Sequence, residues 1–218
     1  MNIKYSNSET LLPSLPFYLN QILLSKNGTA SIYKVFIENS HSPTCKIKWN
    51  NFFHIENNEW NYLFEWVHLL TKDSYLQWLQ TRITHRILAT NYLLFKMNLV
   101  SSDKCTFCKE EKETLLHLFW NCSHTKSFIL DVQQFLKKHD IDWNFDCKSF
   151  ILGYQKPCQG QLNIFCLETK RFIFMCKRRE TKPTLQGLRN SLKLASSITK
   201  YTNSKKSMYS LVDRIVNL

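Results

Sequence analysis

Three cysteines and one histidine lie within eighteen residues near the middle of the sequence. Two residues separate Cys105 from Cys108, and four separate His117 from Cys122. Thiolate sulfur and imidazole nitrogen are the donors of tetrahedral structural zinc sites, and both spacings are close to those of such sites. The stretch therefore predicts one structural zinc ion held by Cys105, Cys108, His117 and Cys122. His124, which lies two residues after Cys122, is an alternative to His117 as the nitrogen donor.

The residues around His117 look helical, and this limits how His117 and Cys122 can reach one ion. Along an α-helix, a step of five residues leaves the second side chain roughly 140° from the first. We therefore expect the helix to end or bend near Asn121, with Ser123 or Thr125 capping the next helix. Four protein ligands leave no coordination position open for water or substrate, which favours a structural ion over a catalytic one.

The composition favours helices as the elements that position these ligands. The 218 residues include only 4 Gly and 5 Pro, whereas a β-sandwich or barrel needs a turn about every ten residues. The hydrophobic content of 44% is enough to bury a core. The predicted fold is mostly α, with one or more helical domains around a small Cys3His zinc knuckle.

Hydrophobic periodicity places amphipathic helices on both sides of the cysteines. Asp73 or Thr71 is expected to cap the first of these helices. We expect a loop over 142–161 and further helices over 162–176, 185–195 and 207–216. The predicted apolar stripes are Leu76, Leu79, Ile83 and Ile87 before the cysteines, and Phe128, Val132, Phe135 and Leu136 after them.

These elements suggest three regions along the chain. Residues 1–58 form an irregular polar lead-in, in which we expect short helices and loops. Residues 59–140 form a helical region that contains the zinc knuckle at 101–125. Residues 141–218 form a basic, helical carboxy-terminal region.

The charge of the chain is strongly positive, with 29 Lys and Arg against 17 Asp and Glu and a formal net charge of +12. Eleven of the basic residues, against two Glu, lie between Leu167 and Lys206. Such a concentration predicts binding to the phosphates of RNA or DNA, although a solvated positive face is the alternative interpretation. The predicted nucleic-acid-binding residues are Arg82, Arg86, Lys170, Arg171, Lys177, Arg178, Arg179, Lys182, Arg189 and Lys193.

Cysteine usage and hydropathy indicate the cellular environment. Five of the 8 Cys are scattered along the sequence, which favours reduced thiols in an intracellular protein over a disulfide scaffold. No secretory signal is expected at the start, and no segment approaches the roughly 18 apolar residues of a membrane span. The predicted location is intracellular, and the pattern does not distinguish nucleus from cytoplasm.

Several segments together resemble the zinc-binding region at the carboxy-terminal end of LINE-type (non-LTR) retrotransposon reverse transcriptases. The resemblance covers roughly residues 47–193, and the two blocks around the cysteines are its most specific part. The segments are Trp78–Asn91, Ser102–Cys108, Glu113–Cys122, Ile151–Gly153 and Leu162–Asn163 with Lys170.

The resemblance implies the same four zinc ligands and a region that binds RNA, with the element's own RNA as the leading candidate. It also implies that the region assists target-primed reverse transcription beside the upstream polymerase core. The sequence has no Asp-Asp pair, such as two catalytic Mg²⁺ ions would need, and no polymerase or endonuclease segment. We therefore expect a non-catalytic fragment of a larger polyprotein.

Three other functions stay open at this point. The chain could be a zinc-stabilised protein-interaction module that docks on a polymerase core, with its charge incidental. It could be an enzyme in which His85 or His139 acts as a base beside a cysteine nucleophile. It could also be an inert remnant of an element.

Overall fold

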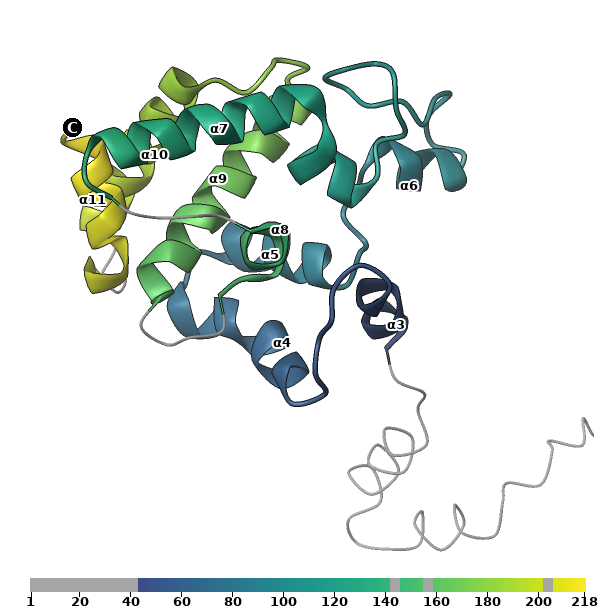
Figure 1. The fold of residues 1–218 in the computed structure, drawn as a ribbon, viewed down its shortest axis with the longest axis horizontal. Coiled ribbons are helices and arrows are strands. Elements are labelled where there is room, and N and C mark those ends of the chain that lie inside the picture. Colours follow the sequence, from purple (N-terminus) through teal and green to yellow (C-terminus); the bar gives the residue numbers. More distant parts are fainter. Residues whose placement is uncertain (1–42, 142–145, 155–158, 202–205) are drawn as a thin grey trace, which may run out of the picture. The chain divides into compact units, whose positions relative to one another are not determined.

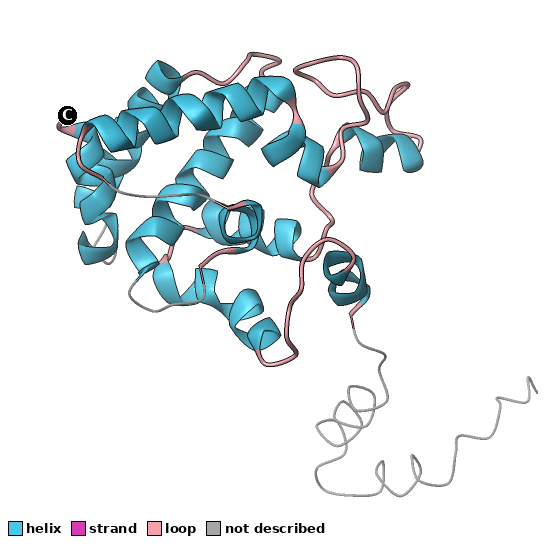
Figure 2. Cartoon of the chain, in the orientation of Figure 1, coloured by secondary structure: helices cyan, strands magenta, loops and turns pink. Residues whose placement is uncertain are grey.

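The computed structural model describes residues 43–141, 146–154, 159–201 and 206–218. Helices dominate these residues, and no strand occurs among them (Figures 1 and 2). The predicted mostly α fold is confirmed. Most of the predicted lead-in, residues 1–42, lies outside the described residues.

A compact unit extends from Cys45 to Leu218. It starts before the boundary predicted at residue 58 and continues through the one predicted at residue 140, because the side chains on both sides of each position share one apolar core. The described elements are α3 (Thr44–Asn50), α4 (Glu59–Leu70), α5 (Ser74–Thr84), α6 (Asn91–Lys96), the π-helical turn η1 (His117–Asn121), α7 (Ser123–Lys138), α8 (Cys147–Leu152), α9 (Gly160–Arg178), α10 (Leu185–Tyr201), the 3-10 turn η3 (Lys206–Tyr209) and α11 (Ser210–Val216).

Helix α9 is the most deeply buried element and forms the centre of the unit (Figure 1). It packs against α5, α8, α10, α11 and η3. Eight consecutive residues, 163–170, are buried, so neighbouring helices cover α9 on all sides. This explains why the sequence of α9 is apolar without a clear helical period.

Helix α5 begins where the sequence predicted and ends earlier. The Asp73 carboxylate caps it by accepting hydrogen bonds from the N–H groups of Tyr75 and Leu76. Helix α5 ends at Thr84, because the next turn closes through Arg86, whose backbone adopts a positive φ of 59°.

The prediction that Ile87 belongs to the buried stripe of this helix is therefore wrong. Ile87 lies beyond the helix and is 52% exposed, whereas Leu76, Leu79 and Ile83 are buried as the predicted stripe required. Arg86 also lies beyond the helix, so it does not share a helical face with Arg82.

Tryptophan side chains join α3 and α4 to the rest of the core. The indole N–H of Trp49 donates to the Thr84 carbonyl at 2.8 Å, and that of Trp66 donates to the Leu152 carbonyl at 2.8 Å. Next to this carbonyl, Gly153 has φ +102°, and a Cβ there would lie 2.7 Å from the Trp66 ring. Only glycine fits this close approach without strain.

Helix α8 lies inside the segment that we predicted to be a loop. Asp146 caps it through a hydrogen bond from the Ser149 N–H, and Phe150, Ile151 and Leu152 are buried. A helix of six residues is too short to give a periodic signal, which accounts for the incorrect prediction.

The later helices follow their predicted patterns. Helix α7 buries Phe128, Val132 and Leu136, and α10 buries Leu188 and Leu192. Helices α10 and α11 pack on each other and on α9. Within the described residues, no helix is long and apolar enough to cross a bilayer.

Candidate metal centre and its connection to the basic surface

Cys105 and Cys108 lie on a tight hairpin closed by the isolated antiparallel bridge between Lys104 and Lys112. The Cys105 N–H donates to the Glu111 carbonyl at 2.8 Å, and the Lys109 N–H donates to the Cys105 carbonyl at 2.9 Å. Lys109 adopts a positive φ of 61°, which lets the chain turn back within a few residues. The hairpin therefore presents both sulfurs on the same side.

A π-helical turn brings His117 and Cys122 together. The N–H of Cys122 donates to the carbonyl of His117 at 2.9 Å, a bond between residues five apart. Residues five apart lie one above the other in such a turn, although they diverge in an α-helix. The predicted interruption near Asn121 is confirmed in this form.

Helix α7 then starts directly at Ser123, without the predicted side-chain cap. The hydroxyl of Thr125 instead donates to the Leu118 carbonyl at 2.9 Å, because Thr125 is buried against the π-helical turn. This bond fixes the turn against the first residues of α7.

The four side chains converge on one point. The Cys105 and Cys122 sulfurs are 3.8 Å apart, the Cys108 sulfur lies 3.4 Å from His117 Nε2, and all four ligand atoms lie within 4.8 Å of one another. Bond lengths of about 2.3 Å to sulfur and about 2.0–2.1 Å to nitrogen give tetrahedral edges of about 3.8 Å and about 3.5 Å. The group can therefore hold one metal ion, and His124 lies outside it.

The two hairpin thiols have different surroundings. Burial raises the pKa of the Cys105 thiol to about 12. Burial also acts to raise the pKa of Cys108, but hydrogen bonds from the backbone of Glu111 and Glu110 and from His117 outweigh it and lower that pKa to about 7. A bound cation would favour the thiolate form of both.

The second nitrogen of the histidine faces an acidic side chain. The Glu111 carboxylate lies 3.2 Å from His117 Nδ1, although the two groups are not aligned for a hydrogen bond. A carboxylate beside the outer nitrogen of a ligating histidine favours the tautomer that leaves the inner nitrogen free to bind metal.

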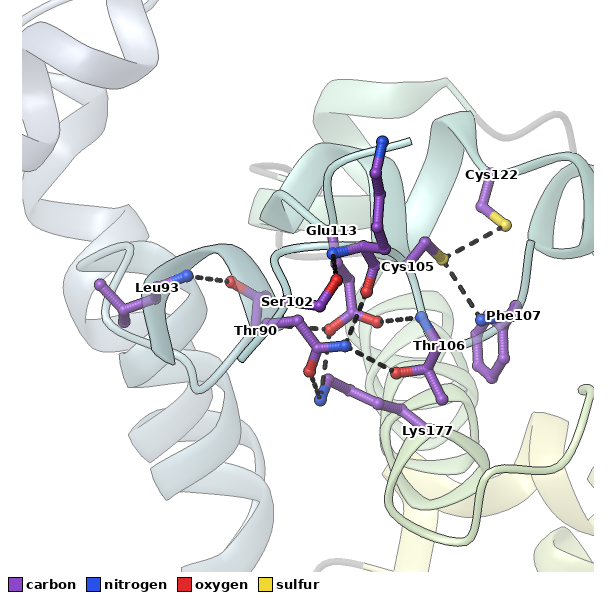
Figure 3. A network of polar contacts seen from close by, with 11 residues as sticks. Thr90, Leu93, Ser102, Cys105, Thr106, Phe107, Glu113, Cys122 and Lys177 are labelled. Carbon is purple, nitrogen blue, oxygen red and sulfur yellow. Dashed lines mark hydrogen bonds and ion pairs between the residues drawn. The ribbon is translucent and has the colours of Figure 1, made fainter. Parts of the chain in front are cut away.

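Glu113 connects the hairpin to the rest of the unit (Figure 3). Its carboxylate is fully buried and accepts hydrogen bonds from the Asn91 N–H at 2.8 Å and the Thr106 N–H at 2.7 Å. Lys177, near the end of α9, places its ammonium 3.2 Å from Glu113 Oε1 and 2.9 Å from Asn91 Oδ1. One carboxylate thus joins α6, the hairpin and α9.

Two lysines from the predicted nucleic-acid-binding set are used inside the protein. Lys177 is only 10% exposed and is engaged by Glu113. Lys170 is fully buried, and its ammonium donates to Gln80 Oε1 at 2.5 Å and to the Ile151 carbonyl at 3.0 Å. Neither ammonium is free to contact a phosphate, so we remove both residues from the set.

Four arginines of the set are half-buried and make contacts within the protein. Arg171 places its guanidinium 2.8 Å from the buried Glu168 carboxylate. The guanidinium carbons of the other three lie over aromatic rings: Arg82 at 4.8 Å from Trp78, Arg86 at 4.4 Å from Trp49 and Arg189 at 5.3 Å from Phe135.

The remaining four members of the set are exposed. Arg178, Arg179 and Lys182 cluster where α9 ends, and Lys193 lies on α10. Arg178 and Arg179 directly follow Lys177, so the Glu113 contact joins the end of α9, where the cluster begins, to the metal-ligand hairpin. We call Arg178, Arg179 and Lys182 the basic turn.

Sequence reasoning missed Glu113, Asn91 and Gln80 as organising residues. All three lie inside the segments that resemble the retrotransposon region, but their residue types alone do not distinguish them from exposed neighbours such as Glu110. The signal that could have identified Glu113 is its position two residues before Leu115, where the mostly apolar segment around His117 begins.

The structure also brings together a cysteine and histidine pair that the enzyme alternative requires. Cys45 Sγ lies 3.9 Å from His85 Nδ1. Burial raises the pKa of the Cys45 thiol, and the His85 ring stacks on Phe64 at 5.1 Å. A buried thiol with a raised pKa is a poor nucleophile, so this pair supports packing rather than catalysis.

Comparison with protein-family models, with curated proteins and with solved structures finds no match to this chain. The resemblance to the retrotransposon region therefore stays a prediction that rests on the quoted residues.

Proposed function

We propose that this chain is a zinc-stabilised, non-catalytic module that binds nucleic acid, of the kind found at the carboxy-terminal end of LINE-type reverse transcriptases. The observation that carries the proposal is the Cys3His group joined through Glu113 to Lys177, directly before the basic turn. Zinc would fix the hairpin, and the hairpin would fix the basic turn for phosphate contact.

Zinc is the metal that best fits the donor set. Three thiolates and one imidazole at tetrahedral distances suit Zn²⁺, whereas Mg²⁺ and Ca²⁺ require oxygen donors. All four positions would be occupied by protein atoms, so the role of the ion is structural.

The electrostatic arrangement favours phosphate as the partner of the basic turn. Its three side chains are exposed, and none forms an ion pair with another described residue. Arg179 and Glu180 end α9 in a left-handed turn with φ 54° at Glu180, which directs the chain away from the helix axis. Unpaired guanidinium and ammonium groups are suited to neutralise backbone phosphates.

A salt titration of RNA binding, measured by fluorescence anisotropy, tests the proposal. The logarithm of affinity should fall linearly with the logarithm of salt concentration. The double variant Arg178→Gln, Arg179→Gln should reduce that slope by about 1.4 on a single strand, at about 0.7 for each phosphate that the variant no longer neutralises.

Lys137→Gln, Lys138→Gln is the matched control, because both lysines are exposed at the end of α7 and the variant removes the same charge. Equal effects of the two variants would indicate a general charge effect and would reject the basic turn as the binding surface. Absence of measurable binding by the wild-type chain would reject the nucleic-acid function.

A second candidate is a protein-docking role, favoured by exposed apolar side chains beside the hairpin. Phe95 is 44%, Met97 58% and Leu99 64% exposed, at alternate positions that end and follow α6. If docking on a polymerase core is the function, RNA affinity should be weak and should respond little to salt.

A further inference from the structure

An aromatic and cationic column lies along the outer face of α5. The rings of Tyr75 and Trp78 stack with centroids 5.4 Å apart and planes inclined by 28°. The Arg82 guanidinium carbon lies 4.8 Å from the centroid of the Trp78 ring. These three residues follow one another at steps of three and four, so they share one helical face. We call them the α5 column.

Core packing does not account for this arrangement. Trp78 is 38% exposed, whereas Trp49, Trp60 and Trp66 are almost fully buried. The indole N–H groups of Trp49 and Trp66 donate to backbone carbonyls inside the core, whereas that of Trp60 has no partner, so exposure is what distinguishes Trp78. The column thus presents part of the Trp78 ring to solvent, flanked by the half-buried side chains of Tyr75 and Arg82.

The neighbouring helix holds the column in place and adds charge. Phe174 on α9 contacts the Trp78 ring at 6.2 Å between centroids, and the Tyr75 hydroxyl lies 3.7 Å from Met175 Sδ. Arg178 lies one helical turn beyond Phe174 and is exposed. The column is therefore connected through α9 to the basic turn.

Arg82 at the end of the column has no acidic partner among the described residues. Its planar guanidinium can stack on a base or, by turning aside, contact a phosphate and leave the Trp78 ring to the base. Both responses suit an unpaired nucleotide, whose base is free to stack on a side chain.

We propose that the α5 column is a stacking platform for an unpaired nucleotide, so that the chain prefers a single strand to a duplex. The inference rests on the proposed nucleic-acid function and names its substrate class. In a duplex the bases stack on one another, and the column would contact only the backbone. A single strand can place one base on the column while its phosphates reach Arg82 and Arg178.

The test compares a single-stranded RNA of about twelve nucleotides, within the range of single-strand site sizes, with the duplex that it forms with its complement. Affinities are measured by fluorescence anisotropy at one salt concentration. Trp78→Leu should weaken single-strand binding about tenfold, the typical loss for one stacked base, and should leave duplex binding within about twofold. Trp78→Phe keeps a ring and should retain most of the affinity.

Phe95→Leu is the matched control, because Phe95 is similarly exposed but lies outside the column. It should change neither affinity. Helix content and metal content are measured for each variant. If Trp78→Leu does not fold, Arg82→Lys decides the test, because it keeps the charge, loses the planar stack and should still weaken only single-strand binding.

The outcomes separate the two proposals. The wild-type chain could bind both RNAs while Trp78→Leu lowers the two affinities equally or not at all. That result would overturn the stacking platform and leave the nucleic-acid function standing. No binding to either RNA by the wild-type chain would overturn the nucleic-acid function itself.

Discussion

The metal-ligand hairpin and the helical body around α9 are organised by different interactions. Near the hairpin, regular structure consists of one isolated bridge, the short helix α6 and the π-helical turn η1, and the side chains of Phe95, Met97 and Leu99 face solvent. The body instead buries three tryptophans and a long run of α9. Apolar burial stabilises the body, whereas the hairpin adds only Phe107 and Cys105 to that core and depends mainly on polar contacts and on its metal ligands.

The two regions also differ in the groups that surround a buried charge. Glu113 in the hairpin is paired with the opposite charge of Lys177. Lys170 in the body is surrounded by neutral oxygens of Gln80 and Ile151, and burial lowers its pKa to about 7. The charge of Glu113 is therefore held in an ion pair, whereas the Lys170 ammonium in the body is poised to lose its proton.

Removing the metal should separate the two regions most strongly. Binding at such sites contributes on the order of ten kcal/mol, so a chelator should abolish amide-exchange protection between Cys105 and Cys122. Amides in the middle of α9 should keep their protection, as measured by hydrogen exchange with mass spectrometry. Cys105→Ser with Cys108→Ser should reproduce the effect, whereas Cys147→Ser, outside the cluster, should not. Unchanged protection of the amides between Cys105 and Cys122 in the presence of chelator would contradict the claim that the hairpin depends on its metal.

Breaking the Glu113 contact should have the next largest effect. Glu113→Gln leaves the Lys177 ammonium without its carboxylate and should lower the free energy of unfolding by about 3 kcal/mol, measured by denaturant titration with zinc present. Glu110→Gln, an exposed neighbour on the same hairpin, serves as control and should be near neutral. Adding Lys177→Met to Glu113→Gln should recover part of the loss. If Glu113→Gln and Glu110→Gln had the same free energy of unfolding, the claim that Glu113 joins the two regions would be rejected.

The Lys170 ammonium should give the body a characteristic pH dependence. Its pKa is lowered from 10.5 to about 7, so between these values the unfolded chain binds a proton that the folded chain does not. Stability from this residue therefore rises with pH from about 7 to about 10, by up to about 1.4 kcal/mol per pH unit. Denaturant titrations over this pH range should show the free energy of unfolding of the wild type rising by that slope relative to Lys170→Met. An equal pH dependence of the two proteins would reject the proposed role of Lys170.

Glu168 should give the opposite pH dependence of stability, over a narrower pH range. This carboxyl lines a cavity of about 460 Å³, and burial raises its pKa from 4.5 to about 7. The folded chain then holds a proton that the unfolded chain has lost, so stability falls as pH rises from about 4.5 to about 7. Glu168→Gln should remove this decline, measured as the difference in melting temperature from wild type. If Glu168→Gln still lost stability over this pH range as the wild type does, other titrating groups would be responsible for the loss.

The metal-binding group could be predicted from the sequence because its four residues lie close together along the chain. Residue type and spacing were sufficient for Cys105, Cys108, His117 and Cys122. The need for an interruption after His117 also followed from helix geometry. The π-helical form of that interruption did not, because it depends on contacts such as the Thr125 hydroxyl with the Leu118 carbonyl.

The basic surface could be predicted only in part, because linear charge counts do not reveal distant partners. Lys177 pairs with Glu113 and Lys170 with Gln80, and both partners lie far away in the sequence. Ile87 continued an apolar stripe by spacing, but the positive φ at Arg86 ended its helix first. Local patterns determined the helices well, and tertiary contacts decided which charges remained at the surface.

X-ray absorption spectroscopy at the zinc edge, with metal content per chain measured on the same sample, tests the central claim most directly. The account predicts one zinc per chain, with three sulfurs at about 2.3 Å and one nitrogen at about 2.0–2.1 Å. Absence of stoichiometric metal, or a coordination shell dominated by oxygen, would contradict it.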